Sequence, residues 1–148
     1  MSLIPLTVTS LHDREMFRVI RNEGVETLSR NARAVTPIEN EAFWAERGND
    51  IRAWLYLSDA DVVGIGSLQR RDGRLWEYVG VKSFYEGHGY GGEILEHLVS
   101  QANGEPVWCT IRTDNVGALR MNERMGGWES LGESDGIVVQ VYRPGAER

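Results

Sequence analysis

Apolar and polar residues follow two different periods along the chain, and each change of period marks a new element. Where apolar residues recur three and four positions apart, as at positions 94, 95, 98, 99 and 102, a helix with one buried face is indicated. Short apolar runs bounded by turn residues indicate strands. Strands are predicted at residues 6–9, 51–58, 62–71, 74–82, 106–111 and 137–142, and helices at residues 10–23, 36–48, 89–103 and 115–125. Residues 24–35 show no sustained period and are predicted to form a loop or broken helix.

Local signals at the ends of these elements indicate how they connect. Ser10 and Thr36 are each followed three residues later by an acidic residue, the pattern of a helix capping box. Turn residues at 59–61 and 72–73 join the three central strands into an antiparallel meander. The strand-helix-strand segment that follows requires a crossover, so at least one strand pair is parallel. The pattern therefore predicts an α/β (α+β) fold with a mixed, mostly antiparallel sheet.

Composition and charge narrow the class of protein. With 148 residues, 41% of them hydrophobic and 26% charged, the chain is typical of one soluble globular domain covering residues 1–148. No apolar run is long enough to span a bilayer and no secretory signal opens the chain, so we expect a cytoplasmic protein without membrane association. The net charge of −6, without a cluster of Lys and Arg, argues against a nucleic-acid partner.

The candidate metal-ligating and thiol residues give no further chemistry. Cys109 has no second cysteine to pair with, and its apolar neighbours predict a buried strand residue. His12, His88 and His97 lack the spacing of metal ligands, so no metal is predicted.

Glycines at 87, 89, 91 and 92 lie where the chain enters the helix at 89–103. With little side-chain bulk there, backbone N–H groups and the helix dipole would favour a phosphate group. The alternative is a tight turn that needs glycine only for positive φ. The spacing of Gly87, Gly89 and Gly92 also fits the dinucleotide fingerprint, but the meander before it does not suit the repeated strand-helix alternation of a Rossmann fold. No Gly-Lys-Ser/Thr follows, which excludes a P-loop.

Two separated motifs resemble the GCN5-related N-acetyltransferase (GNAT) superfamily, and the likeness covers residues 62–128. The family loop Q/R-x-x-G-x-G/A is similar to residues 86–91, with Glu86 where a basic or amide side chain is usual. The family motif N-x-x-A-x-x-x-Y-x-x-x-G-F is similar to residues 115–128, with Asn115 and Ala118 matching and Asn122 in the tyrosine position.

The resemblance implies a GNAT-like sheet of six to seven strands flanked by about four helices, with one β-α-β crossover carrying the glycine loop. It also implies acetyl-CoA or coenzyme A as co-substrate, and no metal. The pantetheine arm would lie along the strand that precedes the loop, and Glu86 leaves the backbone as the main phosphate ligand. The implied cofactor-binding residues are Val79, Val81, Glu86, Gly87, His88, Gly89, Tyr90, Gly91, Gly92, Asn115 and Asn122.

The implied reaction is acyl transfer to a primary amine by direct attack in a ternary complex, and it needs a base. Glu77 is the best candidate, because apolar neighbours would raise the pKa of its carboxyl group; an ordinary solvated strand residue is the alternative. Asn122 cannot titrate, so it is expected only to donate a hydrogen bond to sulfur or to orient water. Because both Glu86 and Asn122 depart from the family pattern, a catalytically impaired acyl-CoA-binding module is the alternative function.

The acceptor is predicted to be a small-molecule or peptide amine bound by the first two helices and their link. A basic lining there would suit an acidic acceptor. A homodimer is also possible. The candidate acceptor-binding residues are Arg21, Asn22, Arg30, Asn31 and Trp44.

Overall fold

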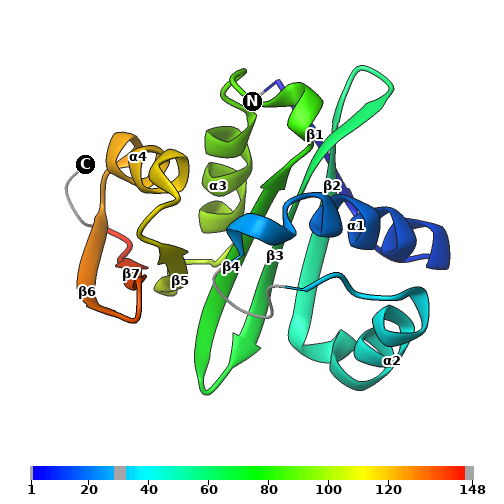
Figure 1. Ribbon diagram of the computed structural model, residues 1–148, viewed down its shortest axis with the longest axis horizontal. Helices are drawn as coiled ribbons and strands as arrows, with labels where there is room; N and C mark the ends of the chain where they lie inside the picture. Colours follow the sequence, from blue (N-terminus) through cyan, green and yellow to red (C-terminus); the bar gives the residue numbers. More distant parts are fainter. Residues whose placement is uncertain (1, 29–32, 146–148) are drawn as a thin grey trace.

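The computed structural model describes residues 2–28 and 33–145, which form one twisted seven-stranded sheet with helices on both faces (Figure 1). The strands are β1 (Ile4–Thr7), β2 (Ile51–Ser58), β3 (Asp61–Arg71), β4 (Arg74–Val81), β5 (Val107–Arg112), β6 (Trp128–Ser134) and β7 (Ile137–Tyr142). The helices are α1 (Leu11–Glu23), α2 (Pro37–Arg47), α3 (Tyr90–Gln101) and α4 (Val116–Met125), with short 3₁₀ turns η1 (Val25–Thr27), η2 (Gly48–Asp50) and η3 (Ser83–Tyr85). The predicted mixed, mostly antiparallel α/β fold is confirmed.

The sheet has the order β1-β2-β3-β4-β5-β7-β6. Strands β2, β3 and β4 form the predicted meander, and the turn at Asp72 and Gly73 has positive φ at both residues, as a two-residue hairpin turn requires. The parallel pair is β4 with β5, joined by α3. Strand β6 was not predicted. It pairs only with β7 at the edge of the sheet, and its exposed side chains carry no apolar alternation.

Alternate residues of the central strands face two separate hydrophobic clusters. On β2, Ala53 and Leu55 pack beneath α1, whereas Trp54 and Tyr56 pack beneath α3. This alternation is the period of two that a strand buried on both faces must show. The sheet is therefore the middle layer of the molecule, with α1 and α2 on one face and α3 on the other (Figure 1).

Two glycines in β3 set the position of α3. A Cβ atom added to Gly64 or Gly66 would lie within 2.8 and 2.9 Å of the Ile94 side chain, respectively. Helix α3 therefore packs closer to the sheet than it could against larger residues. Its N-terminus is fixed just beyond the end of β4, where the glycine loop enters.

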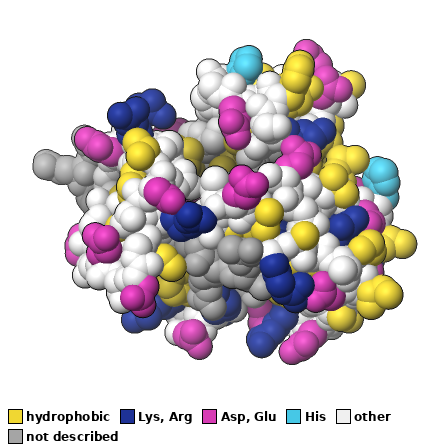
Figure 2. Space-filling view, in the orientation of Figure 1, with side chains coloured by type: hydrophobic (Ala, Val, Ile, Leu, Met, Phe, Trp, Pro, Cys, Tyr) yellow, Lys and Arg dark blue, Asp and Glu magenta, His cyan; other side chains and the backbone are white. Residues whose placement is uncertain are grey.

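The first two helices begin where the sequence predicts. Ser10 and Thr36 are N-caps with complete capping boxes, and the guanidinium of Arg14 pairs with the Glu41 carboxylate at 2.8 Å, which ties α1 to α2. Within the described residues, no helix combines the length and apolar character needed to cross a membrane. On the face drawn in Figure 2, Lys and Arg side chains are interspersed with Asp and Glu.

Candidate functional site

Strands β4 and β5 are joined at one end and diverge at the other. Their parallel ladder contains only the pairs Leu75–Val107 and Trp76–Trp108, and the two indole rings lie 6.0 Å apart at the joined end. From Glu77 onward, the side of β4 that faces β5 has no strand partner. A chain-like ligand can therefore enter between the two strands, as a further strand would.

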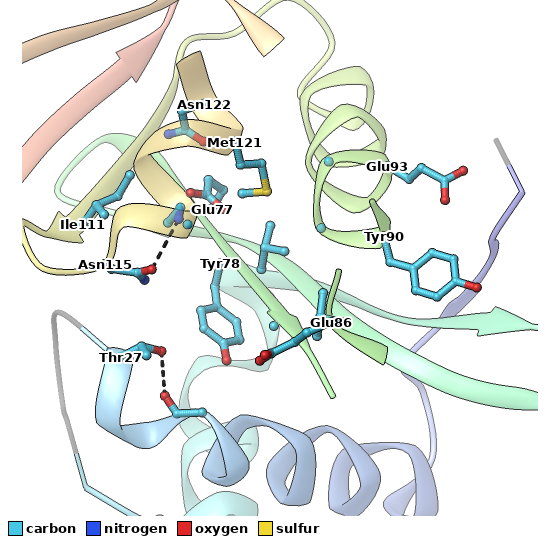
Figure 3. Close-up of a pocket in the computed structure, with 18 of the residues that line it drawn as sticks. Thr27, Glu77, Tyr78, Glu86, Tyr90, Glu93, Ile111, Asn115, Met121 and Asn122 are labelled. Carbon is cyan, nitrogen blue, oxygen red and sulfur yellow. Dashed lines mark hydrogen bonds between the residues drawn. The ribbon is translucent and has the colours of Figure 1, made fainter. Parts of the chain in front are cut away.

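A cleft of about 960 Å³ opens from this divergence, within the size range of small-molecule sites (Figure 3). Its floor is formed by residues 77–81 of β4 with Thr110 and Ile111 of β5. One end is the glycine loop at the start of α3, and the other is the segment 23–28 that follows α1. Arg112, at the end of β5, donates a hydrogen bond to the carbonyl of Glu26 and holds that segment in place.

The glycine loop leaves open space in front of the first turn of α3. Gly87 and Gly89 have φ of 82° and 79°, a left-handed conformation that favours glycine, and Gly89 is the N-cap of the helix. A Cβ atom added to Gly87, Gly89 or Gly92 would meet no atom within 4 Å. The free N–H groups of the first turn and the positive end of the helix dipole both face this space. The loop thus fits a pyrophosphate held by backbone donors.

The other loop side chains divide between the cleft and the loop itself. Glu86 and Tyr90 line the cleft. His88 does not: its Nδ1 lies 3.0 Å from the carbonyl oxygens of both Tyr85 and Glu86, and its ring stacks on Tyr90. The His88 side chain therefore shapes the loop, and the predicted contact of this residue with the cofactor stays a prediction that concerns its backbone.

Glu77 lies at the apex of the divergence, immediately after Trp76, the last residue of β4 that pairs with β5. Protein atoms surround its carboxylate, although the side chain remains partly accessible through the cleft. Burial raises the pKa of Glu77 to about 7, against the smaller lowering effect of a hydrogen bond with Cys109. Figure 3 shows Glu77 on the α4 side, whereas Tyr78 points the other way, toward α1. A carboxyl group with this pKa can take up and release a proton near neutral pH.

Comparison with known proteins identifies the family. The sequence matches the model of the acetyltransferase (GNAT) family over residues 15–127, which is most of the chain. The chain belongs to the acetyltransferase (GNAT) family. Membership confirms the resemblance carried by the two motifs and supports acyl-CoA-dependent acetyl transfer in general terms. No curated protein matches the sequence.

Solved structures share the fold. A GNAT superfamily phosphinothricin acetyltransferase from Sinorhizobium meliloti, in complex with acetyl-CoA, is 15% identical, with a TM-score of 0.78 and coverage of 97% of this chain and 89% of that chain. A ribosomal-protein-alanine N-acetyltransferase from Brucella melitensis is 19% identical, with a TM-score of 0.73 and coverage of 93% and 99%. At these identities the likeness concerns the fold alone.

The residue at the family's tyrosine position, Asn122, borders the cleft but has a buried side chain. Asn122 is 1% exposed, and its Nδ2 donates to Oε1 of Gln140 at 2.8 Å and to Sγ of Cys109 at 3.6 Å. Both amide hydrogens have internal partners in this arrangement, and Asn122 also lines the cleft, so its predicted role toward sulfur or water stays a prediction. The Asn122 Oδ1 atom is buried and has no hydrogen-bond partner in the described part of the chain.

Asn115 is the N-cap of α4 and lines the cleft. Its Oδ1 accepts a hydrogen bond from the N–H of Ala118 at 3.3 Å, so the capping role is present. The amide nitrogen of the same side chain is the group that a pantetheine carbonyl would need. Capping and ligand binding use different atoms and are compatible.

Arg21 and Asn22, two of the residues predicted to bind the acceptor, form hydrogen bonds within the protein. Arg21 donates to the carbonyl of Arg33 at 2.6 Å, and Asn22 exchanges two hydrogen bonds with the backbone of Val35, at 2.9 and 3.0 Å. Neither Arg21 nor Asn22 is among the residues that line the cleft. These contacts join α1 to the segment before α2.

Trp44 likewise has a packing role. Its ring meets that of Phe17 edge to face at 6.3 Å, within the cluster beneath α1, and it does not line the cleft. Arg30 and Asn31 lie outside the described residues, so the structure does not locate them.

Several cleft residues were not found from the sequence. No sequence motif includes these residues, which are Glu23, Glu26, Thr27, Leu28, Glu96 and Arg124. The first four lie in or next to the aperiodic segment after α1. The sequence showed only that this segment lies between two helices. Among the described lining residues Arg124 is the only basic one, whereas the acidic ones are Glu23, Glu26, Glu77, Glu86, Glu93 and Glu96.

Proposed function

We propose that the protein is an acetyl-CoA-dependent N-acetyltransferase that moves the acyl group to a primary amine by direct attack in a ternary complex. The observation that carries the proposal is Glu77, a carboxyl group with a pKa raised to about 7, at the apex of the divergence between β4 and β5. A thioester at the end of a pantetheine arm lying along β4 would reach this apex. The group that takes up the proton and the thioester that is attacked would then lie next to each other.

The residues around the cleft fit the co-substrate. The open space at Gly87 and Gly89 accommodates a pyrophosphate, the unpartnered side of β4 at Val79 and Val81 can bind a pantetheine arm, and Asn115 offers an amide donor. Acetyl-CoA supplies an acyl group activated as a thioester. The acetyl-CoA complex of the Sinorhizobium meliloti protein, which has this fold, supports the same use here.

The proton of the amine is the main obstacle that the protein must remove. An alkyl ammonium with a pKa of about 10 is neutral in only about one molecule in a thousand at pH 7. In the proposed reaction, Glu77 accepts this proton directly or through one water. A backbone N–H on the unpartnered side of β4, near Val79, would stabilise negative charge on the thioester oxygen.

The charges around the cleft favour a cationic acceptor. Six glutamates and one arginine line it among the described residues, and Glu23 and Glu26 lie at the end away from the glycine loop. A cleft lined by one sign of charge concentrates ligands of the other sign. We therefore infer an amine with a second positive charge, such as a diamine or a basic peptide, rather than the acidic acceptor suggested by Arg21 and Arg30.

Release of coenzyme A thiol from acetyl-CoA, measured over a panel of neutral, acidic and cationic amines, tests the proposal. We expect the native protein to show its highest kcat/KM with diamines. In Glu26→Gln, the KM for diamines should rise, whereas the KM for a neutral monoamine should change little. Equal rates for acidic and cationic amines would refute the acceptor class.

Glu77→Gln tests the base. We expect kcat to fall roughly 10²–10⁴-fold and the pH profile to flatten, with coenzyme A affinity nearly unchanged. Glu86→Gln, which removes a cleft charge at the loop instead, should keep the pH profile. Saturable binding of coenzyme A without turnover of any amine would favour an acyl-CoA-binding module, and no thermal stabilisation by coenzyme A would exclude both functions.

A further inference from the structure

A row of polar side chains runs beneath the cleft from the edge strand β6 to Glu77. It consists of Ser130 on β6, Gln140 on β7, Asn122 on α4 and Cys109 on β5. Asn122, Cys109 and Gln140 are 1%, 2% and 8% exposed, and burying polar groups at such positions is unfavourable unless they are hydrogen-bonded. Each of these side chains contacts the next. Glu77 and Cys109 are the residues that follow the last β4–β5 pair, Trp76–Trp108, so they lie beside each other on one face of the sheet, and a hydrogen bond from Cys109 lowers the pKa of Glu77.

The hydrogen bonds in this row have one consistent direction. Gln140 donates through Nε2 to Oγ of Ser130 at 3.0 Å, which leaves its Oε1 to accept from Asn122 at 2.8 Å. The second hydrogen of the Asn122 amide goes to Sγ of Cys109. Because Sγ already accepts there, the S–H of Cys109 is available as the donor toward the carboxylate of Glu77.

The thiol of Cys109 is suited to this donor role. Burial, and secondarily the negative charge of Glu77, raise the pKa of Cys109 well above its ordinary value, so the thiol keeps its proton. A protonated, buried thiol is not a nucleophile; it is a fixed hydrogen-bond donor. Nothing in the mechanism proposed above uses this group.

We propose that Cys109, held in place by Asn122 and Gln140, is a positioning residue that orients the carboxylate of Glu77 toward the acceptor amine. The proposal rests on the proposed function. It assigns a positioning role to Asn122, which stands where the family motif has tyrosine. Asn122 fixes the orientation of the thiol, and the thiol fixes the base.

Few other charged groups near Glu77 could affect the pKa of its carboxyl group. On its own strand, Tyr78 has a pKa raised to about 12, mainly by burial and to a smaller extent by the charge of Glu77. From α1, Arg21 acts on Tyr78. The nearby polar side chains from β7 and α4 are Gln140 and Asn122, which carry no charge. The remaining charged groups of the cleft are Glu23, Glu26, Glu86, Glu93, Glu96 and Arg124. A substitution at Cys109 therefore changes one hydrogen bond to Glu77 without removing a charge.

The pH profile of kcat/KM separates positioning from simple packing. Cys109→Ala removes the donor, so the ionised carboxylate is less stabilised and the midpoint of the acidic limb should rise by about 0.5 pH unit or more. Cys109→Ser supplies a stronger O–H donor and should move the midpoint the other way. Val107→Ala is the matched control, because Val107 lies two residues earlier on the same face of β5, is fully buried and does not line the cleft. It should lose stability without moving the midpoint.

A second readout keeps the proposal testable without turnover. The carboxyl titration of Glu77 can be followed by NMR in the resting protein labelled at glutamate, with the signal identified by its loss in Glu77→Gln. Opposite shifts of the Glu77 pKa in Cys109→Ala and Cys109→Ser would support the positioning role. If no amine is acetylated but these shifts occur, only the proposed function fails. An active protein with the same midpoint in native, Cys109→Ala and Cys109→Ser forms would overturn the positioning role.

Discussion

The raised pKa of Glu77 predicts that this one residue makes the stability of the protein depend on pH. Its pKa changes from 4.5 in the unfolded chain to about 7 in the folded protein. Each pKa unit corresponds to about 1.4 kcal/mol, so ionised Glu77 lowers the free energy of unfolding by at most about 3 kcal/mol. Between these two pKa values the folded protein holds a proton that the unfolded chain has released. Stability contributed by Glu77 is therefore present below pH 4.5 and lost as pH rises to about 7.

Glu77→Gln keeps the shape of the side chain and cannot titrate. Urea unfolding, followed by the fluorescence of the five tryptophans, should show the variant gaining stability relative to the native protein as pH rises from 5 to 8. The gain should be about 2–3 kcal/mol at pH 8, reduced by any hydrogen bond that the amide loses. Glu123→Gln, an exposed charge on α4, controls for loss of one surface carboxylate. A difference between native and Glu77→Gln proteins that stays constant across this pH range would refute the reasoning.

Three further substitutions, one of them with a matched control, each test a single contact. Gly89→Ala and Gly104→Ala both place a methyl group on a backbone of positive φ and should each cost about 1–2 kcal/mol of stability, but only Gly89 lines the cleft. Calorimetry should show coenzyme A affinity falling in Gly89→Ala alone; equal affinity would contradict the pyrophosphate site. Asn115→Asp keeps the capping oxygen and removes the amide donor, so Tm should hold while coenzyme A binds more weakly; unchanged affinity would leave Asn115 only a cap. Asn122→Tyr should lower Tm without raising kcat; a higher kcat would show that position 122 reaches the thiolate.

The fold was predicted wherever the signal was local. The bounds of β2 match the prediction because an apolar run ends in a turn, and α1 and α2 begin at their capping residues. Strand β6 could not be predicted in the same way. It is defined by backbone pairing with β7 at an exposed edge, and only Trp128 and Leu131 in it are large and apolar.

The site was predictable at its loop and much less so elsewhere. The glycine loop is contiguous, so its open geometry follows from its residue types. The acceptor side depends on which face of α1 turns toward the sheet, and Arg21 turns toward the segment before α2 instead of the cleft. The raised pKa of Glu77 was expected from Trp76 and Tyr78, but alternation along β4 points Tyr78 to the opposite face. The environment of the carboxylate includes Cys109, which lies 32 positions later in the sequence, so no local pattern shows this contact.

Asparagine at position 122 and cysteine at position 109 depend on each other through their hydrogen bond. A tyrosine hydroxyl has one hydrogen, so it could not donate to both Gln140 and Cys109, as the two hydrogens of the Asn122 amide do. A phenol would also exceed the space of a side chain that is 1% exposed, and overpacking of this kind typically costs about 1–3 kcal/mol. With an uncharged amide there, Glu77 is the titratable group at the apex, among the described residues, whose pKa lies near neutral pH. With asparagine in place of tyrosine, position 122 has no titratable proton, and its amide supplies a hydrogen bond to Cys109 beside Glu77.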